Sequence, residues 1–295
     1  MTRGAFLGPN SEAPGPPGPR TPADHRYQDG FSSAEGDAKS ERVDWCGWCR
    51  FDTLTESDPG VLPFAALGNH GSKQIEMMRM VSLNVGLPRE VTWRRMTVTT
   101  GFFKQPVTGR VALRKLNLDG DRQADLTVHG GEFKAVYCYP VEHYDYWRRE
   151  LPGVDLPMGS FGENFTTEGW LEDSVHLGDR FSVGSAEVIV TQPRLPCYKL
   201  GVRFQANDMV KRFLASGRMG FYTAVTREGM VGGGDEIEIV SRDENAVPVT
   251  EISRLYVAKR FDEDDLVWLG RALKVSSLPD SWKDYFRERL QQAHH

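Results

Sequence analysis

A series of short β-branched or aromatic segments between residues 81 and 240 constrains the fold more than any other feature of the sequence. Each segment is bounded by Gly, Pro, Asp or Asn, which end strands and form turns. Many short strands with frequent turns and few helices favour a closed or nearly closed β-barrel, so we expect a mainly β fold. The predicted strands span residues 81–85, 96–100, 110–118, 135–139, 175–177, 180–183, 187–191, 220–225 and 236–240.

Local signals place one hairpin and two helices within this region. The stretch LGDRFSVGSAEVIVTQP predicts a hairpin with Gly184 and Ser185 at its tip. A helix is expected over PVEHYDYWRREL, because its initial Pro140 needs no N–H donor at the first helical position. A second helix, NDMVKRFLASG, offers Asn207 or Asp208 as N-cap and ends at Gly217.

The segments on either side of the barrel differ from it in composition. Residues 1–78 are rich in Gly, Pro, Ser and charge, with too little apolar surface to offset the entropy of ordering, so we expect a disordered tail. Residues 246–295 predict three short amphipathic helices, the second capped by Asp262. None of these helices can bury its apolar face alone. They should pack together, or against the barrel domain at residues 79–245, as a small C-terminal module.

Charge and composition narrow the class of protein. The net charge of −5 argues against a general nucleic-acid binder. No apolar run approaches the roughly 18 residues of a membrane span, and the N-terminal residues lack the apolar stretch of a secretory signal. Four cysteines in 295 residues make no disulfide framework, so a reducing cytoplasm is the simplest expectation.

The stretch TQPRLPCYKLG, residues 191–201, holds one thiol in a stiff turn between two cations. Cys197 follows a proline, with Arg194 upstream and Lys199 downstream. Such a cysteine is often just a small buried hydrophobe. Alternatively, the cations hold it as a thiolate, the form that attacks electrophiles or binds metal. Residue types alone leave both interpretations open.

Three further stretches carry groups suited to an anionic or oxygen-rich ligand. DGDRQADLTVHGGEFKAVYCY places His129 and a glycine pair before a predicted strand, and such a pair lets backbone N–H groups approach an anion. MGSFGENFTTEG contains Ser160 and Asn164, and SGRMGFYTAV contains Arg218. The alternative is an ordinary turn in each loop and a solvated arginine. For the glycine pair, the turn is the better interpretation on spacing alone.

Two motifs are set aside. WCGWC, Cys46 to Cys49, has the C-x-x-C spacing of redox dithiols and of half a zinc site, but it lies in the unpatterned tail without a second C-x-x-C. GGGDEIEIV leads into a predicted strand and therefore differs from a dinucleotide-binding loop, which opens a helix.

The order of these stretches resembles the MOSC family, named for the C-terminus of molybdenum cofactor sulfurases. TGRVALRKLNLDGDRQADLTVHGG, GSFGENFTTEG and VHLGDRFSVGSAEVIVTQPRLPCYKL follow one another, with H-G-G, G-E-N and P-R-x-P-C in this order. The residues after Val249, ending in LPDSWKDYFRERL, are similar to the three-helix extension of the YiiM branch. The resemblance covers about residues 80–290.

This resemblance implies a β-barrel that binds the molybdenum cofactor and reduces N-hydroxylated compounds, as amidoxime-reducing enzymes do. Cys197 would supply a soft thiolate ligand to molybdenum. The sequence shows no iron–sulfur spacing and no flavin fingerprint, so an external flavoprotein reductase or ferredoxin-like donor is implied. The C-terminal helices would either dock that donor or only cover the barrel. The residues matched to cofactor binding are Arg114, His129, Gly130, Ser160, Asn164, Arg194 and Arg218.

Three other functions stay open at this point. MOSC domains are also linked to sulfurases, in which Cys197 would carry a persulfide, although the sequence shows no pyridoxal-phosphate domain to load it. A non-catalytic carrier would bind molybdopterin and pass it on. Cys197 and His129 would suit a Cys–His hydrolase if they meet in space. The reductase is the first hypothesis, sulfur transfer the second and the carrier the third.

Overall fold

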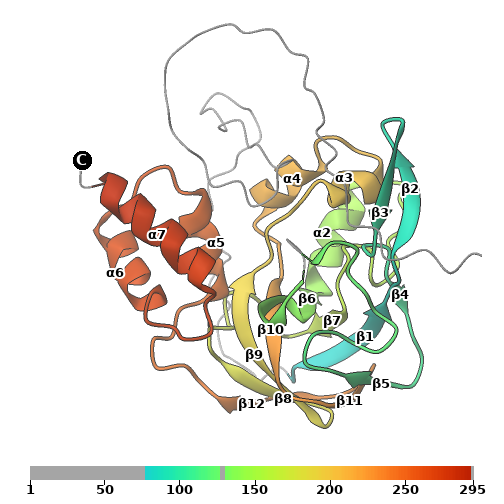
Figure 1. Ribbon diagram of the computed structural model, residues 1–295, viewed down its shortest axis with the longest axis horizontal. Coiled ribbons are helices and arrows are strands. Elements are labelled where there is room, and N and C mark those ends of the chain that lie inside the picture. The colour runs from blue at the N-terminus through green and yellow to red at the C-terminus, as the bar shows by residue number, and fades with distance from the viewer. Residues whose placement is uncertain (1–76, 127–129, 294–295) are drawn as a thin grey trace, which may run out of the picture. The chain divides into compact units, whose positions relative to one another are not determined.

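The computed structural model describes residues 77–126 and 130–293. The tail expected at residues 1–78 lies almost entirely outside the described residues, as do Cys46, Cys49 and His129. The described chain is built around an eight-stranded sheet (Figure 1). Its strand order is β12 (Ile237–Ser241), β8 (Arg180–Val183), β9 (Ala186–Pro193), β10 (Phe221–Arg227), β6 (Val136–Pro140), β7 (Phe165–Glu168), β1 (Arg79–Val85) and β4 (Gln105–Pro106).

Hydrogen bonds near the start of β1 close this sheet into a barrel. On one side β1 pairs antiparallel with β7. On its other side the Met80 N–H donates to the Asp235 carbonyl at 2.8 Å, and the Gly234 N–H donates to the Met80 carbonyl at 2.7 Å. An isolated bridge joins Arg79 to Glu236, just before β12. The mainly β barrel predicted from the strand pattern is therefore confirmed.

Several strand predictions hold and others are wrong. The hairpin with Gly184 and Ser185 at its tip is confirmed, because Val183 of β8 lies opposite Ala186 of β9. The strand predicted at 110–118 stops early, as β5 (Arg110–Leu113). The strand predicted at 175–177 is wrong: only His176 forms an isolated bridge, because the chain turns at a glycine directly afterwards. Three strands were missed besides β4, namely β7, β2 (Arg89–Trp93), which pairs with β3 (Met96–Thr100), and β11 (Gly229–Gly232), which pairs with β5.

The helices follow the capping signals of the sequence only in part. Pro140, expected at the start of a helix, is the last residue of β6, and Asp208 occupies an N-cap position without a side-chain hydrogen bond. The two predicted within the barrel region are α2 (Glu142–Glu150) and α4 (Met209–Ser216), and α4 ends at Gly217 with φ of 65°. The C-terminal three are α5 (Val249–Val257), α6 (Glu263–Ala272) and α7 (Asp280–Ala293). Asp262 forms the predicted cap of α6, as part of a capping box. Two short elements were not predicted: η1 (Glu132–Lys134) and α3 (Lys199–Phe204). Among the described residues, none of the helices is long and apolar enough to cross a membrane.

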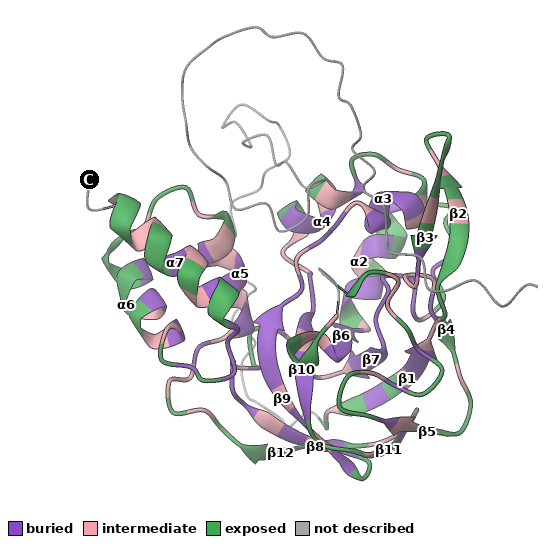
Figure 2. Ribbon diagram, in the orientation of Figure 1, coloured by how far each residue is buried: buried purple, intermediate pink, exposed green. Residues whose placement is uncertain are grey.

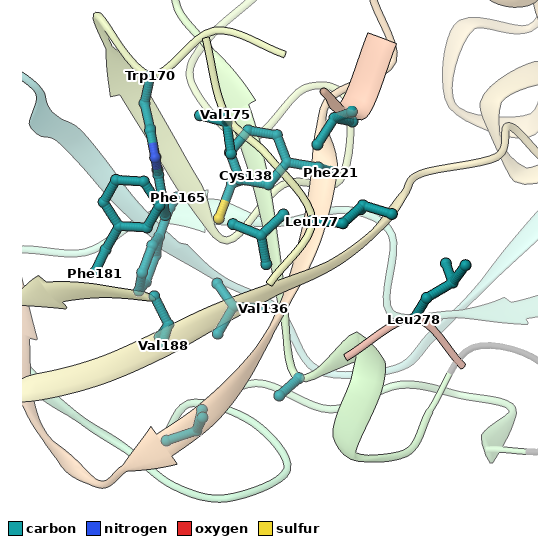
Figure 3. Packing of buried hydrophobic residues seen from close by; sticks show 14 of the residues in the cluster. Val136, Cys138, Phe165, Trp170, Val175, Leu177, Phe181, Val188, Phe221 and Leu278 are labelled. Atoms are coloured by element: carbon teal, nitrogen blue, oxygen red, sulfur yellow. The ribbon is translucent and has the colours of Figure 1, made fainter. Parts of the chain in front are cut away.

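The main hydrophobic core fills the barrel and continues into the C-terminal helices. Figure 3 shows Trp170, Phe181 and Phe221 packed together inside the barrel. The same cluster contains Trp282 and Phe286 of α7, both almost fully buried. Fully burying one large apolar side chain contributes roughly 1.5–3 kcal/mol. The outer faces of α6 and α7 remain exposed (Figure 2), so the three helices bury their apolar faces against each other and the barrel.

A second, mostly aromatic cluster lies beneath the loop at residues 157–164. The rings of Tyr139 and Trp147 are tilted against the ring of Phe161 and stacked on that of Phe213. The Trp147 indole N–H donates to the Tyr139 hydroxyl at 2.7 Å. Because Phe161 belongs to the loop, this cluster holds the loop in place, and Gly162 of the loop lines a pocket at the end of β9.

Candidate functional site

A buried thiol and several cations line one pocket beside the end of β9. Cys197, only 7% exposed, lies in the turn between β9 and α3. Its carbonyl accepts the Leu200 N–H at 3.0 Å, which starts the helix and fixes the turn. The pocket contains about 600 Å³ of empty space, part of it open to solvent. The described residues of its lining include no carboxylate and five cations: Lys104, Arg122, Lys134, Arg194 and Lys199.

Arg194 is a buried cation with one unsatisfied nitrogen. It is 3% exposed, and its guanidinium lies 5.3 Å from the Tyr137 ring centre and 5.6 Å from that of Phe102. Burial alone would lower the pKa of Arg194, but the electrostatic influence of neighbouring groups, Tyr137 foremost, outweighs it and raises that pKa. In the described part of the chain its Nη1 atom has no hydrogen-bond partner. A buried donor left unpaired costs about 1–3 kcal/mol, so this atom favours an acceptor brought by a ligand.

Lys104 and Asp121 form a buried ion pair at the pocket wall. The two side chains are 8% and 0% exposed, and the Lys104 ammonium donates to Asp121 Oδ1. Burial lowers the pKa of Lys104, and the charge of Asp121 acts in the opposite direction. The Asp121 carboxylate also accepts the Gly86 N–H at 2.8 Å. The pair therefore anchors a cation beside the pocket without leaving either charge uncompensated.

Asn164 cross-links the strands that surround this pair. Its Nδ2 atom donates to Asp121 Oδ2 at 2.9 Å and to the Asn84 carbonyl at 3.3 Å. Its Oδ1 atom accepts the Tyr137 N–H at 3.2 Å. Both amide hydrogens are thus already used within the protein. Asn164 lines the pocket, and these bonds give it the role of holding the wall in place.

The loop with the sequence GSFGEN is organised by a buried carboxylate. Glu163, fully buried, accepts the N–H groups of Gly159 at 2.8 Å and Phe161 at 3.0 Å. Burial raises the pKa of Glu163. Gly162 has φ of +82°, and a Cβ there would lie 2.8 Å from the Phe102 ring of the pocket. A glycine is needed at this position because the loop backbone packs directly against the pocket wall.

Lys134 lies where the pocket meets a second cavity. Burial lowers the pKa of Lys134, and the influence of Cys197, which lines the same pocket, acts in the opposite direction. The second cavity, with about 410 Å³ of empty space, is also lined by Gly130 and by Ser281 of α7. Gln192 borders this cavity, and its Oε1 accepts the Trp282 indole N–H at 2.7 Å. The C-terminal helices thus support one edge of the site.

The structure brings together some of the residues that the sequence singled out. Cys197, Arg194 and Asn164 line the same pocket, although they come from the β9–α3 turn and from the loop before β7. Gly130 lines the adjoining cavity and is absent from the described lining of the Cys197 pocket. His129 lies outside the described residues, so its position relative to Cys197 is not part of this geometry.

Three other predicted residues lie outside the lining of this pocket. The exposed Arg114 pairs with Asp119 at 3.2 Å. The Ser160 hydroxyl donates to the Pro157 carbonyl at 2.6 Å, and Ser160 is absent from the described lining. Arg218 stacks on a tyrosine ring at 4.3 Å and donates to the carbonyl of residue 216. Their partners are protein groups, which explains their positions without a ligand.

Comparison with known proteins agrees with this fold. Residues 125–238 match the model of the MOSC domain, and residues 247–293 match that of the YiiM-like 3-alpha helix domain. A Bacillus subtilis (strain 168) protein named YflK is 37% identical over 214 residues, which are 72% of this chain and 95% of that protein. The chain belongs to the YiiM-like MOSC family. Two of the cations in this MOSC pocket, Lys104 and Arg122, precede the matched domain and complete the site from the N-terminal side.

Other members and solved structures resemble this MOSC protein. Protein YiiM of Escherichia coli (strain K12) is 38% identical over 188 residues, covering 63% of this chain and 82% of that protein. The crystal structure of YiiM from Geobacillus stearothermophilus is 35% identical, with a TM-score of 0.60, and covers 72% of this chain and 99% of that one. A protein of Gibberella moniliformis (strain M3125 / FGSC 7600) named "Reductase" is 32% identical over 201 residues, which are 66% of this chain and 35% of that protein.

Proposed function

We propose that this MOSC-family protein binds the molybdenum cofactor and reduces N-hydroxylated compounds with electrons from an external donor. The observation that carries the proposal is the pocket itself: the buried Cys197 thiol shares it with five cations, and the buried Arg194 has an unsatisfied donor. The relative named "Reductase" supports the class of reaction.

The residues of the pocket fit such a cofactor in charge and in donor type. Asp121 pairs with Lys104, whereas the buried Arg194 Nη1 has no hydrogen-bond partner in the described part of the chain. An anionic ligand such as a phosphate-bearing pterin would suit this cation-rich lining and provide an acceptor for Arg194 Nη1. A thiolate is a soft ligand of the kind that suits molybdenum bonded to sulfur. The fit therefore rests on this chain's own residues.

Each part of the pocket would have a separate role. When bound, the cofactor supplies the two-electron, oxygen-removing chemistry. Cys197 would hold the metal, and Arg194 with the neighbouring lysines would hold the anionic part. The rings of Phe102 and Tyr137 line the pocket and flank the Arg194 guanidinium. In the net reaction, R–NHOH takes up two electrons and two protons and yields R–NH₂ and water.

The test compares the two buried thiols of the described chain. Cys197→Ser removes the proposed ligand, whereas Cys138→Ala removes a thiol of the barrel core and serves as the matched control. Each protein, made in a host that produces the cofactor, is assayed for molybdenum and for reduction of 6-hydroxylaminopurine by reduced methyl viologen. We expect turnover in the wild type and the control and its loss in Cys197→Ser.

The other outcomes separate the rival functions. Equal turnover in Cys197→Ser would refute the role of this thiol. Molybdenum without turnover in the wild type would favour a carrier. A persulfide on Cys197 in protein without molybdenum would favour sulfur transfer.

Variants of the arginines test which residues hold the anion. Arg194→Ala should lower the molybdenum content, because it removes the buried donor of the pocket. Arg114→Ala and Arg218→Ala should leave the molybdenum content unchanged, because both side chains bind protein groups outside the lining. A loss of molybdenum in all three variants would contradict the claim that, of these arginines, Arg194 alone lines the pocket.

A further inference from the structure

The hairpin formed by β2 and β3 carries arginines next to the pocket. Residues 89–100 contain three arginines and one acidic residue, Glu90. In the described part of the chain, β2 and β3 form a sheet of their own outside the barrel. Most of the hairpin is exposed, and Figure 1 shows it beside α3. The Trp93 ring lies 3.5 Å from a Cβ built on Gly201, so the hairpin packs against that helix.

The two-residue tip of the hairpin holds two arginines in a left-handed backbone conformation. Arg94 and Arg95 have φ of 48° and 66°, and both are exposed. A two-residue turn of this kind favours Asn and Gly, and a left-handed conformation costs other residues about 1–2 kcal/mol each. The Arg94 guanidinium donates to a neutral acceptor, Asn207 Oδ1, at 3.0 Å. Two exposed arginines at turn positions that favour Asn and Gly point to a functional surface.

Two more arginines connect this tip to the pocket wall. The Arg89 guanidinium lies 4.0 Å from the Phe103 ring centre, and that of Arg203 lies 5.5 Å from the same ring. The pKa of Arg203 is lowered by its burial and by the charge of Arg89. On either side of Phe103 in the chain, Phe102 and Lys104 line the pocket. The two like charges therefore sit directly behind a wall of the site.

These four residues, Arg89, Arg94, Arg95 and Arg203, define the arginine surface. None of the four forms an ion pair with a carboxylate among the described residues. The whole protein has a net charge of −5. An acidic protein would thus be repelled by the molecule as a whole and attracted to this surface, which steers its approach.

We propose that the arginine surface docks an acidic electron-transfer protein of the flavodoxin type beside the pocket. The inference rests on the proposed function, because a reductase needs a donor that faces its active site. The donor loses two electrons in total, and the N-hydroxylated substrate accepts them with two protons to give amine and water. This surface differs from the C-terminal helices, which the sequence offered as the docking candidate.

The experiment measures binding of an acidic flavodoxin to the full chain by calorimetry at low and high salt. The double variant Arg94→Glu with Arg95→Glu reverses the charge of the hairpin tip. Lys259→Glu with Arg260→Glu is the matched control, an adjacent basic pair between α5 and α6. We expect the dissociation constant of the hairpin variant to rise at least about tenfold near 20 mM salt, and the difference to vanish near about 0.5 M salt. The control should bind like the wild type.

Each other outcome has a defined meaning. No flavodoxin binding to the wild type, equal binding by both variants, or a larger effect of the control pair would overturn the proposal. Binding of inorganic phosphate that is lost in the hairpin variant, with flavodoxin binding unchanged, would identify a small-anion site and also overturn it. Methyl viologen turnover should be the same in both variants. Flavodoxin binding without viologen turnover would refute the proposed function and leave the docking surface standing.

Discussion

The buried Asp121 carboxylate supports the pocket wall, and its removal should destabilise the protein strongly. In Asp121→Ala the Lys104 ammonium, 8% exposed, loses its counter-charge. The Gly86 N–H and the Asn164 Nδ2 group lose an acceptor at the same time. Removing one partner of a buried ion pair costs about 3–5 kcal/mol, because the other charge stays buried and unpaired. We therefore expect the free energy of unfolding to fall by about 3–5 kcal/mol.

Urea unfolding, followed by fluorescence, measures this change. The matched control is Asp119→Ala, two positions away, which breaks the exposed pair with Arg114 and should change the stability little, since water screens such pairs. The slope of free energy against urea should be unchanged in both variants. If Asp121→Ala costs no more than Asp119→Ala, the reasoning about the buried network is wrong.

Three further predictions concern the loop, the helices and a buried carboxylate. Gly162→Ala should lower the midpoint of urea unfolding more than Gly109→Ala does. Both glycines have positive φ, but only at Gly162 would the new methyl group press on a ring. Equal midpoints in the two variants would contradict this prediction. Trp282→Phe removes the donor to Gln192 and should cost about 1–3 kcal/mol in thermal unfolding; no change would refute it. Burial would raise the pKa of Glu172, but the charge and hydrogen bond of a neighbouring histidine lower it below the ordinary value. The ionised Glu172 carboxylate therefore stabilises the fold fully above about pH 4.3, and this contribution is lost as the pH falls through the lower pKa of the folded state. In Glu172→Gln the free energy of unfolding should change less with pH over this range.

The sequence was sufficient for those parts of the fold that local signals determine. Gly184 and Ser185 mark a two-residue hairpin, and Asp262 caps a helix, because the backbone bonds of both are satisfied within a few residues. The short helix α3 after Cys197 was missed, since six residues give too little periodicity to detect. Closure of the barrel depends on bonds between Met80 and residues 234–235, far apart in sequence, which only the assembled fold can provide.

For the site, the sequence identified residues whose chemistry is unusual within a short stretch. Cys197 and Arg194 stand in one stiff turn, and both line the pocket. Lys104 gave no signal, because a single lysine after two phenylalanines belongs to no motif, and its role depends on burial beside Asp121. Arg114 lies near the glycine pair in sequence, but β5 ends at Leu113 and the arginine then points into an exposed pair. Proximity in sequence could not show this.

The central claim is that Cys197 binds the metal of a cofactor held in this pocket. X-ray absorption at the molybdenum edge tests it most directly, using wild-type protein and Cys197→Ser from a host that makes the cofactor. The proposal predicts that molybdenum in the wild type has one more sulfur neighbour than molybdenum retained by the variant. Equal sulfur counts in the two proteins, or wild-type protein that binds no molybdenum, would contradict it.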